Sequence, residues 1–233
     1  MIGWLAGLFL LAASSTAGGV PSPCNDRGVM EKFVEFADPS ADHTPAGLEM
    51  AFGKHVVGLE TCLKRWVGDG GEGDGIPLGR GVTRESYRTS ALELLGLLNP
   101  KNERVASWII HNLPSWPQSV QSQALNTLGE IGGDGSFVFL KAETRRTGGD
   151  RRELIWNSLV LMDGPRFATE LESIAPTHDE QALIGSMLIA LNQPVVLPAL
   201  RKLMVLIPEK ARVYAEQIRE IEKQGEKNHE QTN

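Results

Sequence analysis

The chain has 233 residues, enough for one domain with a sizeable core, and its 41% hydrophobic and 22% charged residues argue against a disordered protein. The formal net charge of -6 at pH 7 argues against a nucleic-acid partner, because such a partner requires a clustered basic surface. It favours no other class of partner.

The first residues, 1–17, have the pattern of a secretory signal peptide. Residues 2–13 are apolar and uncharged, and the Ser-Thr-Ala of residues 15–17 fits the small-x-small rule for cleavage after Ala17. A membrane anchor is the less favoured alternative, since about twelve apolar residues fall short of the roughly 20 that span a bilayer. We therefore expect a periplasmic or secreted protein whose mature chain has no transmembrane segment.

The mature chain contains two cysteines, Cys24 and Cys62. In an oxidising compartment an even count predicts a disulfide, here one that ties the mature N-terminus to the end of an early helix. By loop-closure entropy such a bond contributes roughly 4 kcal/mol. The alternative is a pair of buried thiols in a cytosolic protein, which requires the signal interpretation to be wrong.

An N-terminal helical cap is expected at residues 29–67, after an irregular lead-in at residues 18–28. Two helices, Val29–Ala37 and Ala46–Trp66, make up this cap. The second has apolar side chains on one face, at Leu48, Phe52, Val56, Leu59 and Leu63.

A glycine-rich loop follows at residues 68–83. Its carboxylates Asp69, Glu72 and Asp74 are a weak candidate for a calcium site, because a hard cation binds oxygens from a flexible turn. The match is poor, since the alternating acids and the closing Glu of an EF-hand are missing. A flexible linker between the cap and the following helices is the favoured interpretation.

From residue 84 onward the sequence repeats a unit of about thirty residues. Residues 91–100 (ALELLGLLNP) are followed 33 residues later by residues 124–133 (ALNTLGEIGG), and two more copies come after further steps of 31 and 29. Each copy is apolar at helical spacing and ends in a turn rich in Gly, Asn, Asp or Pro, after which a second amphipathic stretch begins. The unit is therefore predicted to be helix, tight turn, helix, and stacked units would bury a continuous core.

This unit resembles the HEAT-repeat family in its short bacterial form, whose first helix has an Ala-Leu-x-x-Leu-Gly-x-Ile-Gly-like pattern. The resemblance covers about residues 84–207, and the copy at 118–146 matches best. It implies an all-α solenoid of about four repeats, with a concave, partner-binding surface lined by the second helices. We also expect a capping helix at 208–223 and a disordered polar tail at 224–233.

Candidate partner-binding residues lie on that surface. The second helices carry charges that would form a mixed but locally basic ridge, which suits an acidic protein surface. Trp116 is the better surface candidate among the tryptophans, because it sits in an inter-repeat loop, whereas Trp108 and Trp156 fall on apolar repeat positions. The candidates are Trp116, Lys141, Arg145, Arg146, Arg166, Arg201 and Lys202. An ordinary solvated face is the alternative for each charge.

Catalytic patterns are missing from the sequence. No two histidines have the spacing of a zinc helix, and no Gly-x-Ser-x-Gly element is present. We expect no enzyme activity, cofactor or metal, and we predict an exported scaffold or adaptor that binds another protein through the concave face. The alternatives are an immunity or inhibitor protein against a toxin or enzyme, an adaptor for peptidoglycan or a membrane surface, and an enzyme with a dispersed site.

Overall fold

The computed structural model describes residues 24, 26–38, 52, 58–79 and 82–231, and these fold into helices without any strand, which confirms the all-α prediction. The expected signal peptide lies outside the described residues. None of the described helices is long and apolar enough to cross a membrane. The helices are α1 (Arg27–Phe36), α3 (Leu59–Asp69), α4 (Arg84–Leu98), α5 (Glu103–Asn112), η2 (Leu113–Ser115), α6 (Gln118–Ile131), α7 (Asp134–Thr144), α8 (Gly149–Met162), α9 (Gly164–Ile174), α10 (His178–Leu191), η3 (Pro194–Val196), α11 (Leu197–Leu206), η4 (Pro208–Lys210) and α12 (Ala211–Gln231).

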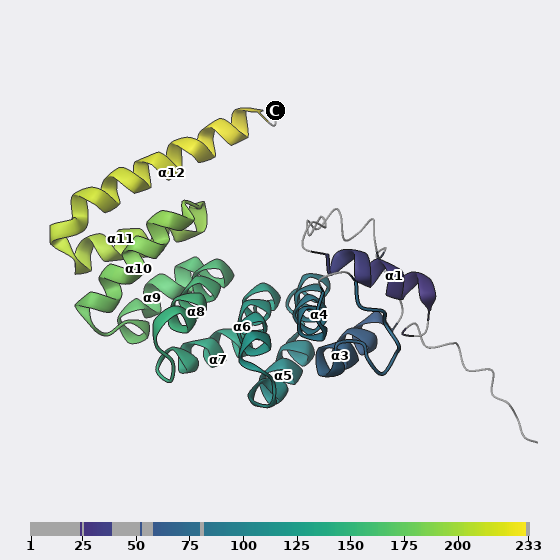
Figure 1. Ribbon diagram of the computed structural model, residues 1–233. Helices are drawn as coiled ribbons and strands as arrows, with labels where there is room; N and C mark the ends of the chain where they lie inside the picture. The colour runs from purple at the N-terminus through teal and green to yellow at the C-terminus, as the bar shows by residue number, and fades with distance from the viewer. Residues whose placement is uncertain (1–23, 25, 39–51, 53–57, 80–81, 232–233) are drawn as a thin grey trace, which may run out of the picture.

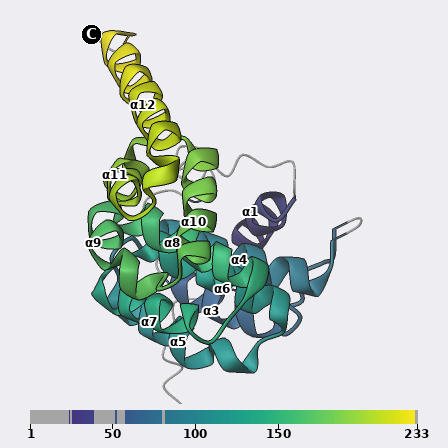
Figure 2. The same cartoon turned by 90° about the vertical axis from the view of Figure 1, so that its left-hand side faces the viewer.

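Helices α4 to α11 are arranged in two rows. In the first row α4 packs against α6, α6 against α8 and α8 against α10, and the second row contains α5, α7, α9 and α11. Figure 2 shows the two rows side by side. The rows bend along the chain, so that α1 and α12 rise on the same side at opposite ends (Figure 1).

Two glycines explain how closely the first-row helices stack. A Cβ atom on Gly96 would lie 3.0 Å from Cγ2 of Thr127, and one on Gly129 would lie 2.8 Å from Cβ of Ser158. Gly96 and Gly129 are equivalent positions of two sequence copies, and so are Thr127 and Ser158. At both the α4–α6 and the α6–α8 contact, a glycine therefore lets the residue at the equivalent position of the next helix approach closely.

The turns between paired helices follow from local chemistry. Gly132 and Gly133 have φ values of 70° and 88°, which favour glycine and let the chain reverse between α6 and α7. Asp163 accepts a hydrogen bond from a backbone N–H in the first turn of α9. Thr177 and Glu180 form a reciprocal capping box that starts α10.

The N-terminal cap is held by the predicted disulfide, which the structure confirms. Cys24 and Cys62 are bonded, with their Cα atoms 5.1 Å apart. Cys62 lies in the first turn of α3 rather than near the C-terminal end of a longer helix, because α3 begins at Leu59 after Gly58, whose φ is 85°. Residues 46–51 and 53–57 of the expected second cap helix lie outside the described residues.

The glycine-rich loop is fastened to α4, which differs from the flexible linker expected at this place. Arg84 donates hydrogen bonds from Nη1 to the carbonyl oxygens of Gly70 and Ile76, at 3.1 and 2.7 Å. The hydroxyl of Tyr87 donates to the carbonyl oxygen of Pro77 at 2.9 Å. Since Ile76 is fully buried, this part of the loop belongs to the core that joins α3 to α4.

Helix α12 packs against α11 and α10 at the C-terminal end of the rows, and it extends beyond residue 223. It continues through the polar segment after residue 223 as far as Gln231. Tyr214, Ile218 and Ile221 are buried against the preceding helices. The segment beyond them is rich in Glu, Lys and Gln, which have high helix propensity and extend the helix without an apolar stripe.

Candidate functional site

Most cations of the predicted basic ridge are next to carboxylates of the protein itself. Nζ of Lys141 lies 2.5 Å from Oε2 of Glu170. Arg166 contacts Oδ1 of Asp134 at 2.6 Å and Oε1 of Glu170 at 3.1 Å, and its guanidinium lies 4.0 Å from the ring centroid of Phe137. The hydrogen bond from Lys141, opposed by partial burial and aided by Arg166, holds the pKa of Glu170 below its usual range.

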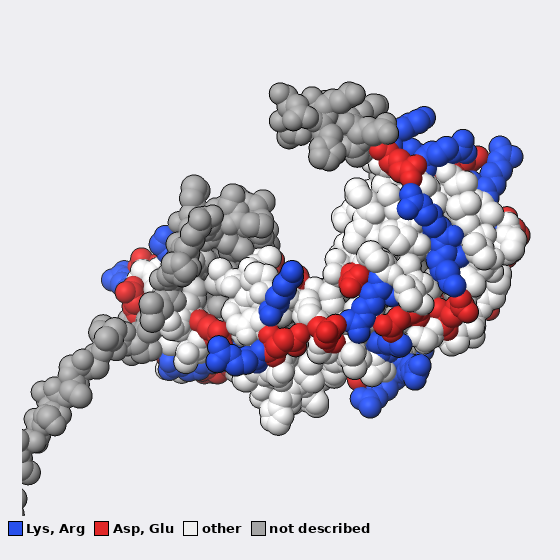
Figure 3. Space-filling model, turned by 180° about the vertical axis from the view of Figure 1, so that it is seen from behind, with Lys and Arg blue, Asp and Glu red and all other residues white. Residues whose placement is uncertain are grey.

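Further pairs complete this pattern on the second row and α12. Arg146 pairs with Glu143 at 3.0 Å, Lys202 with Glu172 at 2.6 Å and Arg201 with Glu222 at 2.7 Å. Arg145 is exposed, and no described residue forms an ion pair with it. Figure 3 shows acidic and basic residues alternating over this side of the molecule. The surface is therefore mixed in charge instead of locally basic.

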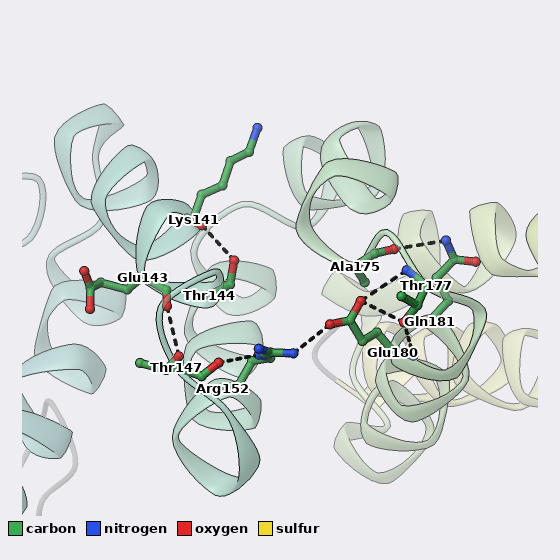
Figure 4. Close-up of polar contacts among 9 residues, drawn as sticks. All are labelled: Lys141, Glu143, Thr144, Thr147, Arg152, Ala175, Thr177, Glu180 and Gln181. Atoms are coloured by element: carbon green, nitrogen blue, oxygen red, sulfur yellow. Dashed lines mark hydrogen bonds and ion pairs between the residues drawn. The ribbon is translucent and has the colours of Figure 1, made fainter.

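Several of these pairs join residues that are one sequence repeat apart. Lys141 and Glu170 are separated by 29 residues, and Arg152 and Glu180 in the first row by 28. Figure 4 shows the second case, in which Arg152 donates to Oε1 of Glu180 at 2.6 Å and to the carbonyl oxygen of Thr147 at 2.7 Å. These ion pairs hold neighbouring helix pairs together, which gives them a structural role.

The prediction that Trp116 lies on the surface is wrong. Its side chain is buried, with 8% exposure, and its ring centroid lies 5.6 Å from that of Trp108. The short helix η2 precedes Trp116 and turns the inter-repeat loop inward, so that the Trp116 side chain packs inside the protein. Trp108 is only half-buried, and Nζ of Lys64 lies 5.4 Å from the centroid of the Trp108 ring. Trp156 is buried as predicted.

Two of the three carboxylates of the weak calcium candidate, Asp69 and Asp74, accept hydrogen bonds from protein donors. Asp69 accepts hydrogen bonds from two backbone N–H groups of its own loop, at 2.7 and 2.9 Å. Asp74 accepts hydrogen bonds from Nε1 of Trp66 and Nη1 of Arg65, each at 2.7 Å. Glu72 is exposed. In the described part of the chain no three His, Cys, Asp or Glu residues are grouped so that they could hold a metal ion.

A hollow of about 470 Å³ lies along the turns that connect α4 to α5, α6 to α7 and α8 to α9. Its charged lining includes Lys101 and Glu103 together with Asp134 and Arg166, which bind each other. The Glu103 carboxylate lies against Gly135 at the start of α7, where a Cβ atom would be 2.7 Å from Oε2. The protein's own side chains thus already satisfy much of the charge in this hollow.

A groove between α8 and α10 is the site that sequence reasoning missed. It has a volume of about 330 Å³ and is mostly apolar; we call it the α8–α10 groove, and it is lined by Glu153, Leu154, Asn157, Met187, Ala190 and Leu191. Two further apolar residues extend its walls along the same helix stripes, since Leu161 follows Asn157 by four residues and Leu183 precedes Met187 by four. Each of these two leucines is 43% exposed.

The groove exists because α10 departs from the packing of the earlier first-row helices. The position of Gly96 and Gly129 is occupied by Val160 in α8, and the position of Thr127 and Ser158 by Met187 in α10. Both side chains are larger, so α10 cannot approach α8 as α8 approaches α6. Instead the end of α10, at residues 187–191, lies beside residues 153–157 of α8.

A buried polar atom of Asn157 is a second reason to regard the groove as a binding site. Oδ1 of Asn157 is buried and has no hydrogen-bond partner. Leaving a buried acceptor unpaired costs on the order of 1–3 kcal/mol, so such groups are uncommon in native proteins. An incoming hydrogen-bond donor that reorients this side chain would recover part of that energy.

An acidic pair lies further along the first row. Glu130 of α6 stands at the sequence position that is Leu97 in α4 and Leu161 in α8. Although part of its side chain is exposed, its carboxylate lies over the backbone of α4, where a Cβ atom on Gly96 would be 2.5 Å from Oε2. Burial of the carboxylate, and then the negative charge of Glu93, raise the pKa of Glu130 to about 7.

Comparisons of the chain with protein-family models, with curated proteins and with solved structures found no match.

Proposed function

We propose that the protein is an exported scaffold that binds another protein through the face of the first row, with the α8–α10 groove as the main contact. The helix pairs are proposed to form a HEAT-like solenoid of about four repeats, which the equivalent packing of Gly96 and Gly129 supports. The binding surface proposed here differs from the second-row ridge, since the cations of that ridge are largely paired within the protein.

The open apolar groove is the observation that carries this proposal. Its walls continue into Leu161 and Leu183, which remain 43% exposed in the folded chain. Single exposed leucines are common, but an apolar groove flanked by further exposed apolar side chains is typical of a binding site. A protein partner would bury these side chains and so gain the free energy of removing them from water.

Export is supported by the disulfide together with the apolar N-terminal segment. Disulfides persist in oxidising compartments, and the Cys24–Cys62 bond is fully buried in the cap. We place the protein in the periplasm or outside the cell on this basis. Mass analysis with and without reductant tests the bond, and detection of two free thiols in unreduced protein would contradict this part of the proposal.

Crosslinking in the exported fraction of the source cells tests the binding proposal. The variant Ala190→Lys places a long charged side chain at an exposed position of the groove, and Val138→Lys makes the matched change on the second row, where Val138 is 59% exposed. We expect discrete crosslinked partners with the wild type and Val138→Lys, and their loss with Ala190→Lys. A crosslinking pattern that is the same for both variants, or no adduct with the wild type, would refute the proposal.

A further inference from the structure

We propose that the partner protein binds through an extended, uncharged segment that crosses the first row from α6 to the α8–α10 groove. The side-chain amides of Asn126 and Asn157 bind the backbone of this segment, and one of its apolar side chains enters the groove. This inference rests on the proposed function and names the chemistry of the partner.

Asn126 and Asn157 differ from the other asparagines whose side chains the structure describes. Those others all make side-chain hydrogen bonds at helix ends: Asn99, Asn102, Asn112 and Asn192. Asn126 and Asn157 lie inside α6 and α8, and no described residue forms a hydrogen bond with the side chain of Asn126 or with Oδ1 of Asn157. Asparagine is a weak helix former, so these two residues cost helix stability without an internal hydrogen bond in return. This combination indicates a ligand outside the chain.

The spacing of the two amides matches an extended chain. Both asparagines are partly exposed, and they occupy the same position of two consecutive sequence copies. Because Gly129 of α6 lies against Ser158 of α8, Asn126 and Asn157 differ by only about 3 Å in height along the helices. Packed helices lie about 8–10 Å apart, and an extended chain rises about 3.3 Å per residue. The two amides can therefore bind backbone groups about three residues apart.

The chemistry of the amides favours an extended segment over a helix. A side-chain amide carries an acceptor oxygen and an NH2 donor, which complement the N–H and C=O groups of a peptide backbone. A helix uses these backbone groups internally, whereas an extended segment without a strand partner presents them to its surroundings. The equivalent position in α4 is Glu93, so the pair of amides is confined to α6 and α8.

The α8–α10 groove lies next to Asn157 and provides the apolar contact. Its volume of about 330 Å³ is at the lower end of the roughly 300–1,000 Å³ of ligand pockets, which suits one or two side chains. Successive side chains of an extended chain point to opposite sides, so a residue that faces α8 and α10 can place its side chain between Leu154 and Met187. The segment itself crosses the helices and needs no long channel.

The charges near the groove favour an uncharged segment. Arg151 donates to Oε1 of Gln121, a neutral amide, at 2.9 Å and therefore keeps its positive charge. Glu153 lines the groove with a negative charge, and Arg152 is already paired with Glu180. One cation and one anion so close together give no preference for either sign. Affinity should therefore change little with salt.

A displayed library of random eight-residue peptides tests the proposal when it is selected on the full chain. Two helix spacings span roughly 20 Å, or about six extended residues, so eight residues are long enough. We expect enriched peptides that are uncharged and share one large apolar residue. A labelled synthetic copy measures affinity by fluorescence anisotropy, and its binding should be lost with Ala190→Lys and kept with Val138→Lys.

Asparagine variants test the amide contacts. Asn126→Ala and Asn157→Ala should each weaken binding of the selected peptide about five- to tenfold. The control Thr169→Ala removes an exposed polar side chain from inside α9 of the second row and should change binding less than about twofold. Because alanine is the better helix former, the urea midpoint of both asparagine variants should stay the same or rise.

Changes to the peptide backbone provide the complementary test. Methylation of one backbone nitrogen at a time removes one donor, and it should weaken binding most at two positions about three residues apart.

The inference is overturned if no peptide is enriched, if the asparagine variants bind as tightly as Thr169→Ala, or if their urea midpoints fall. If crosslinking to a natural partner still depends on Ala190 in that case, the proposed function stands and only the extended segment is wrong. If crosslinking also ignores Ala190→Lys, both fail.

Discussion

A methyl group on Gly185 should loosen the contact between α10 and α12. Gly185 lies in the middle of α10 and is buried, and a Cβ atom there would lie 2.8 Å from Cζ and 2.9 Å from Cε1 of Tyr214, with the phenol oxygen closer still. Tyr214 is 1% exposed, so its ring has little room to move. The substitution Gly185→Ala therefore sets a steric cost against the higher helix propensity of Ala.

The steric cost and the gain in helix propensity together set the change in the free energy of unfolding. Overpacking a well-filled core costs about 1–3 kcal/mol, and the rigid ring places Gly185→Ala at the upper end of that range. The gain in helix propensity is about 1 kcal/mol, so the net loss should be about 2 kcal/mol. Gly68 provides the control, because it is exposed in α3 with no heavy atom within 4 Å of the added Cβ. Gly68→Ala should gain about 0.5–1 kcal/mol.

Urea unfolding followed by circular dichroism measures both variants, and the two free energies of unfolding should move in opposite directions. Tyr214→Phe adds a second test, since Oη is buried without a hydrogen-bond partner and is the atom nearest the added methyl. Combined with Gly185→Ala, it should recover part of the loss. If both glycine variants are stabilised, or if Tyr214→Phe recovers nothing, the packing argument is wrong.

Three further perturbations address the disulfide, the acidic pair and the ion pairs. Replacing Cys24 and Cys62 by Ala should lower the free energy of unfolding by about 4 kcal/mol, the loop-closure value for their separation of 38 residues; a loss below about 1 kcal/mol in urea unfolding would contradict it. Since the pKa of Glu130 is raised from 4.5 to about 7 in the folded state, that state binds the proton more tightly, and stability is lost as pH rises between these values. Glu130→Gln should remove this part of the pH dependence, and an unchanged slope would refute the assignment. Arg166→Ala should cost about 1–2 kcal/mol, more at low salt than at high salt, whereas Arg145→Ala should stay within about 0.5 kcal/mol; equal losses would show that the ion pairs contribute little.

Local patterns in the sequence predicted the helices and the disulfide. Apolar residues at helical spacing are local information, so the helices around residues 91–100 and 124–133 follow from the sequence. The two cysteines left one possible intramolecular pair, and the structure confirms it. The burial of Trp156 follows in the same way from its place on an apolar stripe.

Contacts between repeats were not predictable in the same way. Lys141 and Glu170 each look exposed on an isolated helix, and only the stacking of α7 near α9 makes them a pair. Burial of Trp116 depends on how η2 turns the loop, which its sequence neighbours do not indicate. The groove depends on Val160 and Met187 standing where the two earlier first-row contacts have Gly96 with Thr127 and Gly129 with Ser158, a signal visible only when the copies are aligned.

The two ends of the rows are closed by different means. At the N-terminal end a covalent bond joins the segment at Cys24 to α3, whereas at the C-terminal end α12 is held by noncovalent packing, including Tyr214 against Gly185 of α10. In a chain whose helix pairs contact mainly their neighbours, opening begins at the end that can separate. One wall of the groove, α10, belongs to that end. An occupied groove would tie α8 to α10 and brace the fraying end, so occupancy and the lifetime of the folded C-terminal end would rise together.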